Sequence, residues 1–190
     1  MRRLVVWNLM TLDGLFEGTK PWELDFHLLA WGEELEAFSL QQGDEIGTLL
    51  FGRRTYEGMA AHWSKETGPI AEMMNGMEKA VASRTLETAD WNNTRLLKGE
   101  AVDAVRKLKA EAGKDVFVFG SADLLDSLLG AGLVDEYRIC LVPVVYGAGN
   151  PLFKPATRQV PMKLQASRPL KSGGVILTYH VQKPRRTDQA

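Results

Sequence analysis

The sequence predicts an α/β fold, in which a mixed, mostly parallel sheet carries helices on both faces and ends in an antiparallel hairpin. In the first two-thirds of the chain, short apolar, β-prone runs alternate with segments of helical periodicity, which is typical of a parallel sheet. In the last third, strand-like runs follow one another with short connections, which indicates antiparallel pairing. The length of 190 residues suits one domain, which we place at residues 1–183, with a polar, disordered tail at residues 184–190.

The first strand is predicted at residues 4–10, an apolar run interrupted only by Asn8. It leads into a turn that contains Asp13 and Gly14. This turn places a carboxylate at the carboxyl end of a strand, the edge at which α/β sheets open their active sites. Two interpretations of Asp13 stay open, a functional carboxylate and an ordinary Asp-Gly turn. Residues 15–24 are predicted as a loop that is long enough to serve as a lid.

A single helix is predicted over residues 25–42, because apolar residues recur there at spacings of three and four. These residues are Leu28, Trp31, Leu35 and Phe38. Asp25 is a plausible cap for the start of this helix. His27 falls on the same helix, beside the expected site. Most helix histidines are solvated or packed, so a direct role and a structural role are both kept for His27.

The remaining elements follow from the same two patterns. Strands are predicted at residues 46–51, 79–82, 116–119, 137–142, 162–168 and 175–182, and helices at residues 56–63 and 101–112. A short methionine-rich helix is predicted within residues 64–76, where packing explains the methionines better than a cofactor site does. The last two strands form the terminal hairpin.

The strand at residues 116–119 runs directly into Gly120, and Ser121 follows at the position of a helix N-cap. The order of elements is therefore a buried strand, a tight glycine turn and a leucine-rich helix. Such a junction leaves backbone N–H groups unpaired at the positive end of a helix dipole, and this arrangement can bind phosphate. Many α/β domains have junctions that bind nothing, so the turn alone does not decide the function.

Composition excludes several classes of function. A net charge of −1 provides no attraction to nucleic acid or to an anionic membrane surface. The single cysteine, Cys140, lies in an apolar run, so we expect a buried thiol and neither an intrachain disulfide nor a cysteine-based zinc site. No stretch approaches the roughly 20 apolar residues of a membrane span. We therefore expect a cytoplasmic protein that acts on a small molecule.

Two further strand ends carry groups that can bind phosphate. They are Gly52, Arg53, Arg54 and Thr55 after residues 46–51, and Ser83 and Arg84 after residues 79–82. Arginine binds phosphate with paired hydrogen bonds. Positive charge at a helix start opposes the helix dipole unless an anion compensates. This weakens the alternative that Arg53 and Arg54 are simply solvated.

Four segments in this order resemble the dihydrofolate reductase-like superfamily. They are residues 11–14 (Thr-Leu-Asp-Gly), residues 51–56 (Phe-Gly-Arg-Arg-Thr-Tyr), residues 118–122 (Val-Phe-Gly-Ser-Ala), and residues 133–137 together with a Pro-to-Phe run at residues 143–153. The resemblance is closest to the reductase domain of the bifunctional riboflavin-biosynthesis deaminase/reductase and its stand-alone relatives. It spans residues 4–182 and implies a three-layer fold and a homodimer.

The resemblance also implies NADPH-dependent hydride transfer to a C=O or C=N carbon of a small substrate. By position, the cofactor-binding residues would be Gly52, Arg53, Arg54, Thr55, Ser83, Arg84, Gly120, Ser121, Ala122 and Asp123. Trp7, Asn8 and Asp13 would line the substrate site, and Asp13 and His27 are the candidate catalytic residues. A histidine at this place predicts a turnover rate that changes with pH between about pH 5 and 8.

Two departures from the family pattern bear on the substrate. Gly120-Ser121 replaces the usual pair of glycines, and the added hydroxyl can still donate to phosphate. His27 stands where folate enzymes keep an acidic residue, which favours the riboflavin-type branch, a reductase of the 5-amino-6-(5-phosphoribosylamino)uracil type. Dihydrofolate reductase remains an alternative, and so does a non-catalytic NADP-binding or interaction protein.

Overall fold

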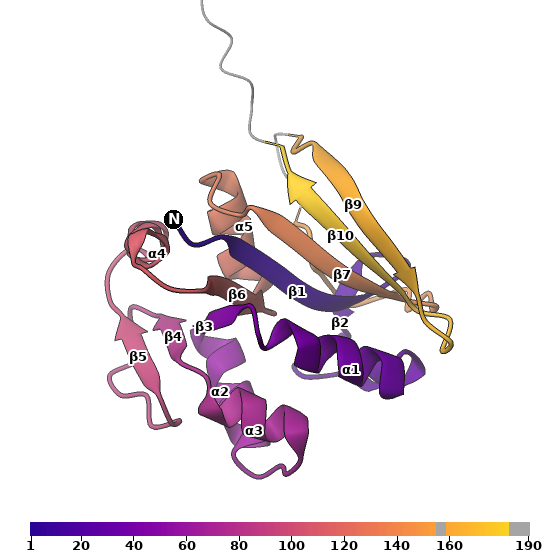
Figure 1. Cartoon of the computed structure of the whole chain (residues 1–190), viewed down its shortest axis with the longest axis horizontal. Helices are drawn as coiled ribbons and strands as arrows, with labels where there is room; N and C mark the ends of the chain where they lie inside the picture. Colours follow the sequence, from indigo (N-terminus) through magenta and orange to yellow (C-terminus); the bar gives the residue numbers. More distant parts are fainter. Residues whose placement is uncertain (155–158, 183–190) are drawn as a thin grey trace, which may run out of the picture.

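Eight strands form one sheet in the computed structural model, which describes residues 1–154 and 159–182. Their spatial order is β5-β4-β3-β6-β1-β7-β10-β9 (Figure 1). The strands are β1 (Leu4–Thr11), β3 (Ile46–Gly52), β4 (Lys79–Ala82), β5 (Thr94–Leu97), β6 (Asp115–Phe119), β7 (Glu136–Val142), β9 (Met162–Pro169) and β10 (Val175–Val181). The first six are parallel to one another, and β10 and β9 pair antiparallel. The predicted mixed sheet with a C-terminal hairpin is confirmed.

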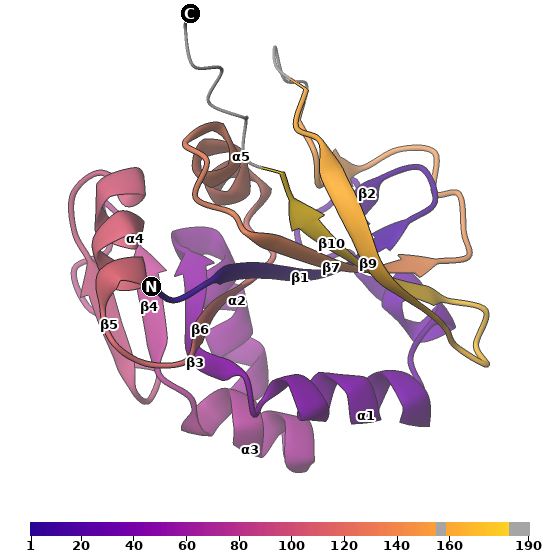
Figure 2. The ribbon, with the colours of Figure 1, turned by 45° about the horizontal axis from the view of Figure 1, so that its top comes forward.

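Helices cover both faces of this sheet, as predicted (Figure 2). They are the 3₁₀-helix η1 (Asp25–Leu29) and the α-helices α1 (Glu33–Gln42), α2 (Arg53–Trp63), α3 (Pro69–Gly76), α4 (Ala101–Ala110) and α5 (Ala122–Gly130). Helices α1, α2 and α3 pack through Leu35, Tyr56 and Met74 into one hydrophobic core, and α4 and α5 pack through Leu108 and Leu128 into the other. Among the described residues, no helix is both long and apolar enough to cross a membrane.

Strand β1 separates the two cores because successive side chains of a strand point to opposite faces. Val5 and Trp7 belong to the core beneath α1–α3, whereas Leu4 and Val6 belong to the core beneath α4 and α5. Both neighbours of β1, β6 and β7, run parallel to it. This burial on both faces explains why β1 is a continuous apolar run in the sequence rather than an alternating one.

The single helix predicted over residues 25–42 is wrong. The chain forms η1 and α1 instead, and Gly32, in an extended conformation, precedes α1. The apolar spacing was misleading, because Leu28 is 76% exposed while Phe26 and Ala30 are buried. Asp25 lies inside η1 and does not cap it. A second difference is the short strand β2 (Leu15–Glu17), which forms within the segment predicted as a loop and pairs with β8 (Asn150–Pro151).

The parallel register brings three strand ends to one edge of the sheet. Leu50 of β3 is level with Val118 of β6, and Trp7 of β1 is level with Phe119 of β6. The turns that follow β3 and β6 therefore meet beside the carboxyl half of β1, where ligands of parallel sheets bind. The predicted disordered tail at residues 184–190 lies outside the described residues.

Candidate functional site

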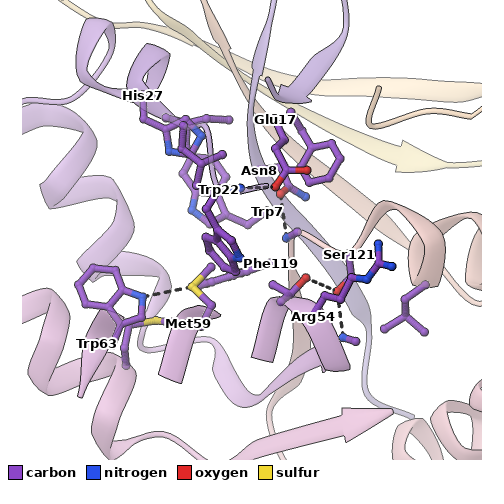
Figure 3. Close-up of a pocket in the computed structure, with 18 of the residues that line it drawn as sticks. Trp7, Asn8, Glu17, Trp22, His27, Arg54, Met59, Trp63, Phe119 and Ser121 are labelled. Carbon is purple, nitrogen blue, oxygen red and sulfur yellow. Dashed lines mark hydrogen bonds between the residues drawn. The ribbon is translucent and has the colours of Figure 1, made fainter. Parts of the chain in front are cut away.

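A pocket of about 720 Å³ opens at this edge of the sheet. Figure 3 shows two parts of it, with Arg54 and Ser121 on one side, Trp63, Met59 and His27 on the other, and Asn8 between them. We call the first part the phosphate end, lined by Gly52, Arg53, Arg54, Thr55, Gly120, Ser121 and Asp123. We call the second part the aromatic chamber, lined by Trp7, Asn8, Trp22, His27, Trp31, Ser39, Gln42, Met59, Trp63 and Met73.

Two glycine turns approach each other closely at the phosphate end. A Cβ atom built on Gly52 would lie 3.0 Å from Ser121 Oγ, and one built on Gly120 would lie 3.1 Å from Thr55 Cγ2. Gly120 also has a φ of +67°, a conformation that favours glycine. The two turns are joined by the Ser121 hydroxyl, which accepts a hydrogen bond from the Gly52 N–H at 2.9 Å and shares one with Thr55 Oγ1 at 2.6 Å.

Ser121 precedes α5, as predicted, but it does not cap the helix with its side chain. Its backbone is left-handed, with a φ of 64°, and its hydroxyl is used by Gly52 and Thr55. Helix α2 also begins without a side-chain cap, after Gly52. Two helix N-termini with uncapped N–H groups therefore face the phosphate end, and both helix dipoles favour an anion there.

The predicted arginines differ in their surroundings. Arg54 lines the pocket and has no hydrogen-bond or ion-pair partner among the described residues. Arg53 also lines the pocket, and its guanidinium lies 3.1 Å from Glu57 on the next helical turn. An exposed pair of this kind is weak, so Arg53 can exchange Glu57 for a stronger anion. Asp123 lines the pocket and pairs with Lys154.

Three predicted cofactor residues lie outside the pocket lining. Ala122 is buried in the first turn of α5, where only its backbone can serve an anion. Ser83 uses its hydroxyl to accept the N–H groups of Thr85 and Leu86. Arg84 is exposed and lies 3.8 Å from Glu100. Because Gly52 is level with Ala82 in the register of β3 and β4, Ser83 and Arg84 nevertheless follow the same edge of the sheet.

The predicted substrate residues Trp7 and Asn8 both line the pocket. Trp7 packs against Phe38 of α1, with ring centroids 5.3 Å apart. Asn8 Oδ1 accepts a hydrogen bond from the Gly120 N–H at 2.8 Å, so Asn8 connects β1 to the glycine turn after β6. Asn8 Nδ2 is buried and has no partner among the described residues.

His27 also lines the pocket, as expected, and Phe26 packs edge-on against its ring. Burial lowers the pKa of His27 to about 4, with the nearby Asp25 carboxylate opposing the shift. The imidazole is therefore neutral at neutral pH. A pKa of about 4 lies below the range of about pH 5 to 8 in which the sequence predicts a change of rate with pH, and it disfavours His27 as the cause of such a change.

Asp13 lies in the turn after β1 and is not part of the pocket lining. Its carboxylate accepts hydrogen bonds from Thr11 Oγ1 at 2.6 Å, from the Gly147 N–H at 2.7 Å and from the Tyr146 N–H at 3.1 Å. These hydrogen bonds, with that of Thr11 first, lower the pKa of Asp13 to about 2. An ionised carboxylate with three donors favours the turn interpretation over that of a proton donor.

The structure adds chamber residues that the sequence reasoning missed. The sequence places Trp31 on the apolar face of a helix, and it places Trp63 and Gln42 only at the ends of predicted helices. Met73 follows the methionine-rich pattern, and it lines the pocket as well as packing against the core. Among the described residues, no group of three histidine, cysteine or acidic side chains could hold a metal ion.

The sheet and its helices define the fold class of the protein as dihydrofolate reductase-like. Dihydrofolate reductase from Enterococcus faecalis, solved with NADP(H), aligns with a TM-score of 0.65 and 15% identity over 95% of this chain and 97% of that chain. A riboflavin biosynthesis protein from a Shewanella species, whose function is described only tentatively, aligns with a TM-score of 0.77 and 20% identity, covering 95% and 99% of the two chains.

Within this class, a model of the RibD C-terminal domain matches residues 2–176, and the chain belongs to that family. Among curated proteins, the uncharacterized protein YyaP of Bacillus subtilis is 32% identical over 94% of this chain and 95% of its own length. A Thermotoga maritima protein named as a deaminase and 5-amino-6-(5-phosphoribosylamino)uracil reductase aligns with a TM-score of 0.65 and 12% identity. The alignment covers 95% of this chain and 57% of that protein.

Proposed function

We propose that the protein is an NADPH-dependent reductase of a small substrate, similar to the reductases of riboflavin biosynthesis. The observation that carries this proposal is the phosphate end, where two uncapped helix N-termini and two arginines, Arg53 and Arg54, surround one cleft. These four sources of positive charge favour an anion at one site. Membership of the RibD C-terminal domain family supports a reductase.

The residues at this end fit the phosphates of a dinucleotide. Gly52 and Gly120 lack side chains where a Cβ would meet the opposite turn, so the two turns lie close enough together to bind one pyrophosphate between their helix N-termini. Arg54 is free to bind the additional 2′-phosphate that distinguishes NADPH from NADH. When bound, NADPH would supply the hydride. The chain would hold the phosphates at one end and orient the substrate in the aromatic chamber beside Asn8.

The same geometry disfavours folate as the substrate. The pocket lining contains two carboxylates, Glu17 and Asp123. Glu17 accepts hydrogen bonds from the Trp22 N–H and from Asn150, and Asp123 pairs with Lys154. His27, at the place of the acidic residue of folate enzymes, is neutral at neutral pH because burial lowers its pKa to about 4. Both carboxylates of the pocket lining therefore already have partners, which disfavours the pairing of either with a pteridine.

The test is a titration of NADPH and NADH into the protein, followed by a panel of substrates. The panel includes dihydrofolate, the ribosylaminopyrimidine and simple carbonyl compounds, and NADPH absorbance reports turnover. We expect tighter binding of NADPH than of NADH and turnover of at least one carbonyl compound. Equal affinity for the two cofactors would contradict the cofactor assignment. NADPH binding without turnover across the panel would favour the non-catalytic alternative.

We also propose that two copies associate through the C-terminal hairpin. Strand β9 is at the edge of the sheet, so its outer backbone groups are available for pairing. Its side chains are largely exposed, and Leu164 is 48% exposed on this strand. In a two-fold arrangement of two such edges, the outer backbone groups of β9 in both copies would pair in the same way.

A further inference from the structure

We propose that the aromatic chamber selects a flat, uncharged molecule with carbonyl-type hydrogen-bond acceptors, and that Asn8 and Gln42 recognise those acceptors. The inference rests on the proposed function, because it names the substrate class for the same pocket. It separates this protein from an enzyme that acts on a phosphoribosylated compound, the kind of substrate named for the Thermotoga maritima protein.

The amide of Asn8 has one orientation that satisfies its neighbours. Its Oδ1 atom accepts the Gly120 N–H at 2.8 Å, and a flipped amide would set two N–H donors against each other. The Nδ2 group must therefore be the end of the amide that is left without a hydrogen-bond partner. Asn8 is only 8% exposed, and Nδ2 has no partner in the part of the chain that the structure describes.

Gln42, at the end of α1, is fixed in the same way by a partner far away in the sequence. Its Oε1 atom accepts a hydrogen bond from Arg138 Nη1 at 3.2 Å. Arg138 is itself held by Glu45 at 2.7 Å and by Glu136 at 2.6 Å, so the donor cannot turn away. Gln42 is 2% exposed, and its Nε2 group lacks a partner among the described residues.

Buried polar nitrogens without partners are rare in folded proteins, and each needs an explanation. Three of them belong to side chains that line this one pocket, namely Asn8 Nδ2, Gln42 Nε2 and His27 Nε2, and the nitrogens themselves are buried. The two amide groups can only donate, so a ligand that satisfies them must present acceptors. Carbonyl oxygens meet this requirement without carrying a charge.

The walls of the chamber determine the rest of the ligand. Trp7, Trp31 and Trp63 contribute indole rings, and Met59 and Met73 contribute thioethers, which together favour a flat ring system. The cationic side chains that line the pocket, Arg53 and Arg54, are both at the phosphate end. A phosphate on the substrate would therefore enter an apolar chamber without a counter-charge, which is unfavourable.

Isothermal titration calorimetry with three matched probes tests this inference without relying on turnover. The probes are 2,3-dimethyl-1,4-naphthoquinone, 2,3-dimethylnaphthalene, which has the same ring without the oxygens, and 1,4-naphthoquinone-2-sulfonate, which adds a charge. We expect the neutral quinone to bind at least about tenfold more tightly than either comparison compound, because only it pairs the two amides without burying an anion. Equal or tighter binding of the sulfonate or the hydrocarbon would overturn the inference.

The variant Gln42→Glu keeps the oxygen that Arg138 requires and replaces the donor with an acceptor. We expect it to weaken quinone binding by at least about tenfold. The control Gln41→Glu makes the same change at the exposed neighbouring position and should leave binding unchanged. If Gln42→Glu does not fold, Asn8→Asp makes the equivalent change at the other amide. Quinone affinity that stays unchanged in the folded variant would overturn the inference.

A parallel NADPH titration separates this inference from the proposed function. NADPH binding together with rejection of the neutral quinone would overturn the substrate class and leave the reductase proposal intact. Quinone binding that depends on Gln42, without any NADPH binding, would support the chamber assignment and contradict the cofactor assignment.

Discussion

The indole of Trp22 lies against the bare backbone of Gly58, so closely that a Cβ atom at position 58 would lie 1.8 Å from Trp22 Cζ2. Trp22 belongs to the loop between β2 and η1 and adopts a positive φ of 64°. The backbone N–H of Trp22 donates to Glu17 Oε1 at 2.7 Å, which also holds the loop in place. Because Trp22 also lines the pocket, the absent side chain of Gly58 determines where one wall of the aromatic chamber stands.

Gly58→Ala is expected to lower the melting temperature. Alanine favours the interior of α2 by about 1 kcal/mol, but the added methyl group displaces the Trp22 ring. Thermal unfolding followed by circular dichroism measures the result. Gly76→Ala is the matched control, because nothing lies within 4 Å of a Cβ at position 76. In the Trp22→Ala background the penalty should disappear, and a penalty that persists there would reject the contact as its cause.

Arg54→Ala is expected to weaken NADPH binding by about tenfold or more, the effect of one charge-assisted hydrogen bond to phosphate. Binding of NADH should change less, since NADH lacks the 2′-phosphate. Calorimetric titration of both cofactors measures the two effects. Arg106→Ala removes an exposed arginine that is paired with Asp103 on α4 and serves as the control. Equal losses in the Arg54 and Arg106 variants would remove Arg54 from the cofactor site.

The buried His27 predicts a loss of stability in weak acid. Its folded pKa of about 4 lies below the ordinary value of 6.5, so the unfolded chain binds the proton more readily. The contribution of His27 is therefore complete above about pH 6.5 and decreases as the pH falls toward 4, by up to about 1.4 kcal/mol per pH unit. Urea unfolding at several pH values across this range gives the free energy of unfolding as a function of pH. This free energy should change less steeply with pH in His27→Gln than in the control variant His62→Gln, which replaces an exposed histidine. An identical slope in both variants would contradict the burial of a neutral imidazole.

Asp13→Asn separates the two interpretations of this residue. If Asp13 holds the turn, the variant loses an acceptor for the Gly147 or Tyr146 N–H and unfolds at a lower temperature at pH 7. The folded pKa of about 2 lies below the ordinary 3.8, so the contribution of Asp13 is present above about pH 4 and is lost as the pH falls toward 2. The acid-dependent loss should therefore be smaller in Asp13→Asn. Slowed turnover with unchanged stability would instead support the catalytic interpretation.

Association through β9 predicts a species of twice the 21.1 kDa chain mass in sedimentation at micromolar concentration. Leu164→Lys places a charge on the exposed edge strand and should shift the protein toward the monomer. Gln165→Lys adds the same charge at the next position, which points to the opposite face of the strand, and should have the smaller effect. A wild-type protein that sediments as a monomer would reject the proposed assembly.

The strand ends were predictable because the signal for each of them is local. A buried apolar run followed by glycine, as at Gly52 and Gly120, reports a strand and the turn that terminates it. The break between η1 and α1 was harder to predict, because exposed Leu28 imitates a core position and only the packing of Phe26 and Ala30 reveals the true inner face.

The two amide donors could not have been identified from the sequence. Asn8 meets the Gly120 N–H across 112 positions of the chain, and Gln42 meets Arg138 across 96. Which end of each amide faces the pocket depends on these distant partners, and no local pattern contains that information. The sequence analysis places Asn8 at the substrate site by resemblance, but it does not predict the bond to Gly120 or the direction of the amide.

The central position of β1 has a consequence for folding. The first strand to be synthesised cannot pair until its partner strands, more than 100 residues further along the chain, have also been synthesised. Leu4 pairs with Val116, and Val5 pairs with Glu136. Contacts of such long sequence separation slow folding and leave unpaired strand edges exposed until the partners arrive. A chain that is truncated before β6 would therefore present both edges of β1 to other chains. We expect such a fragment to aggregate rather than to form a smaller folded unit.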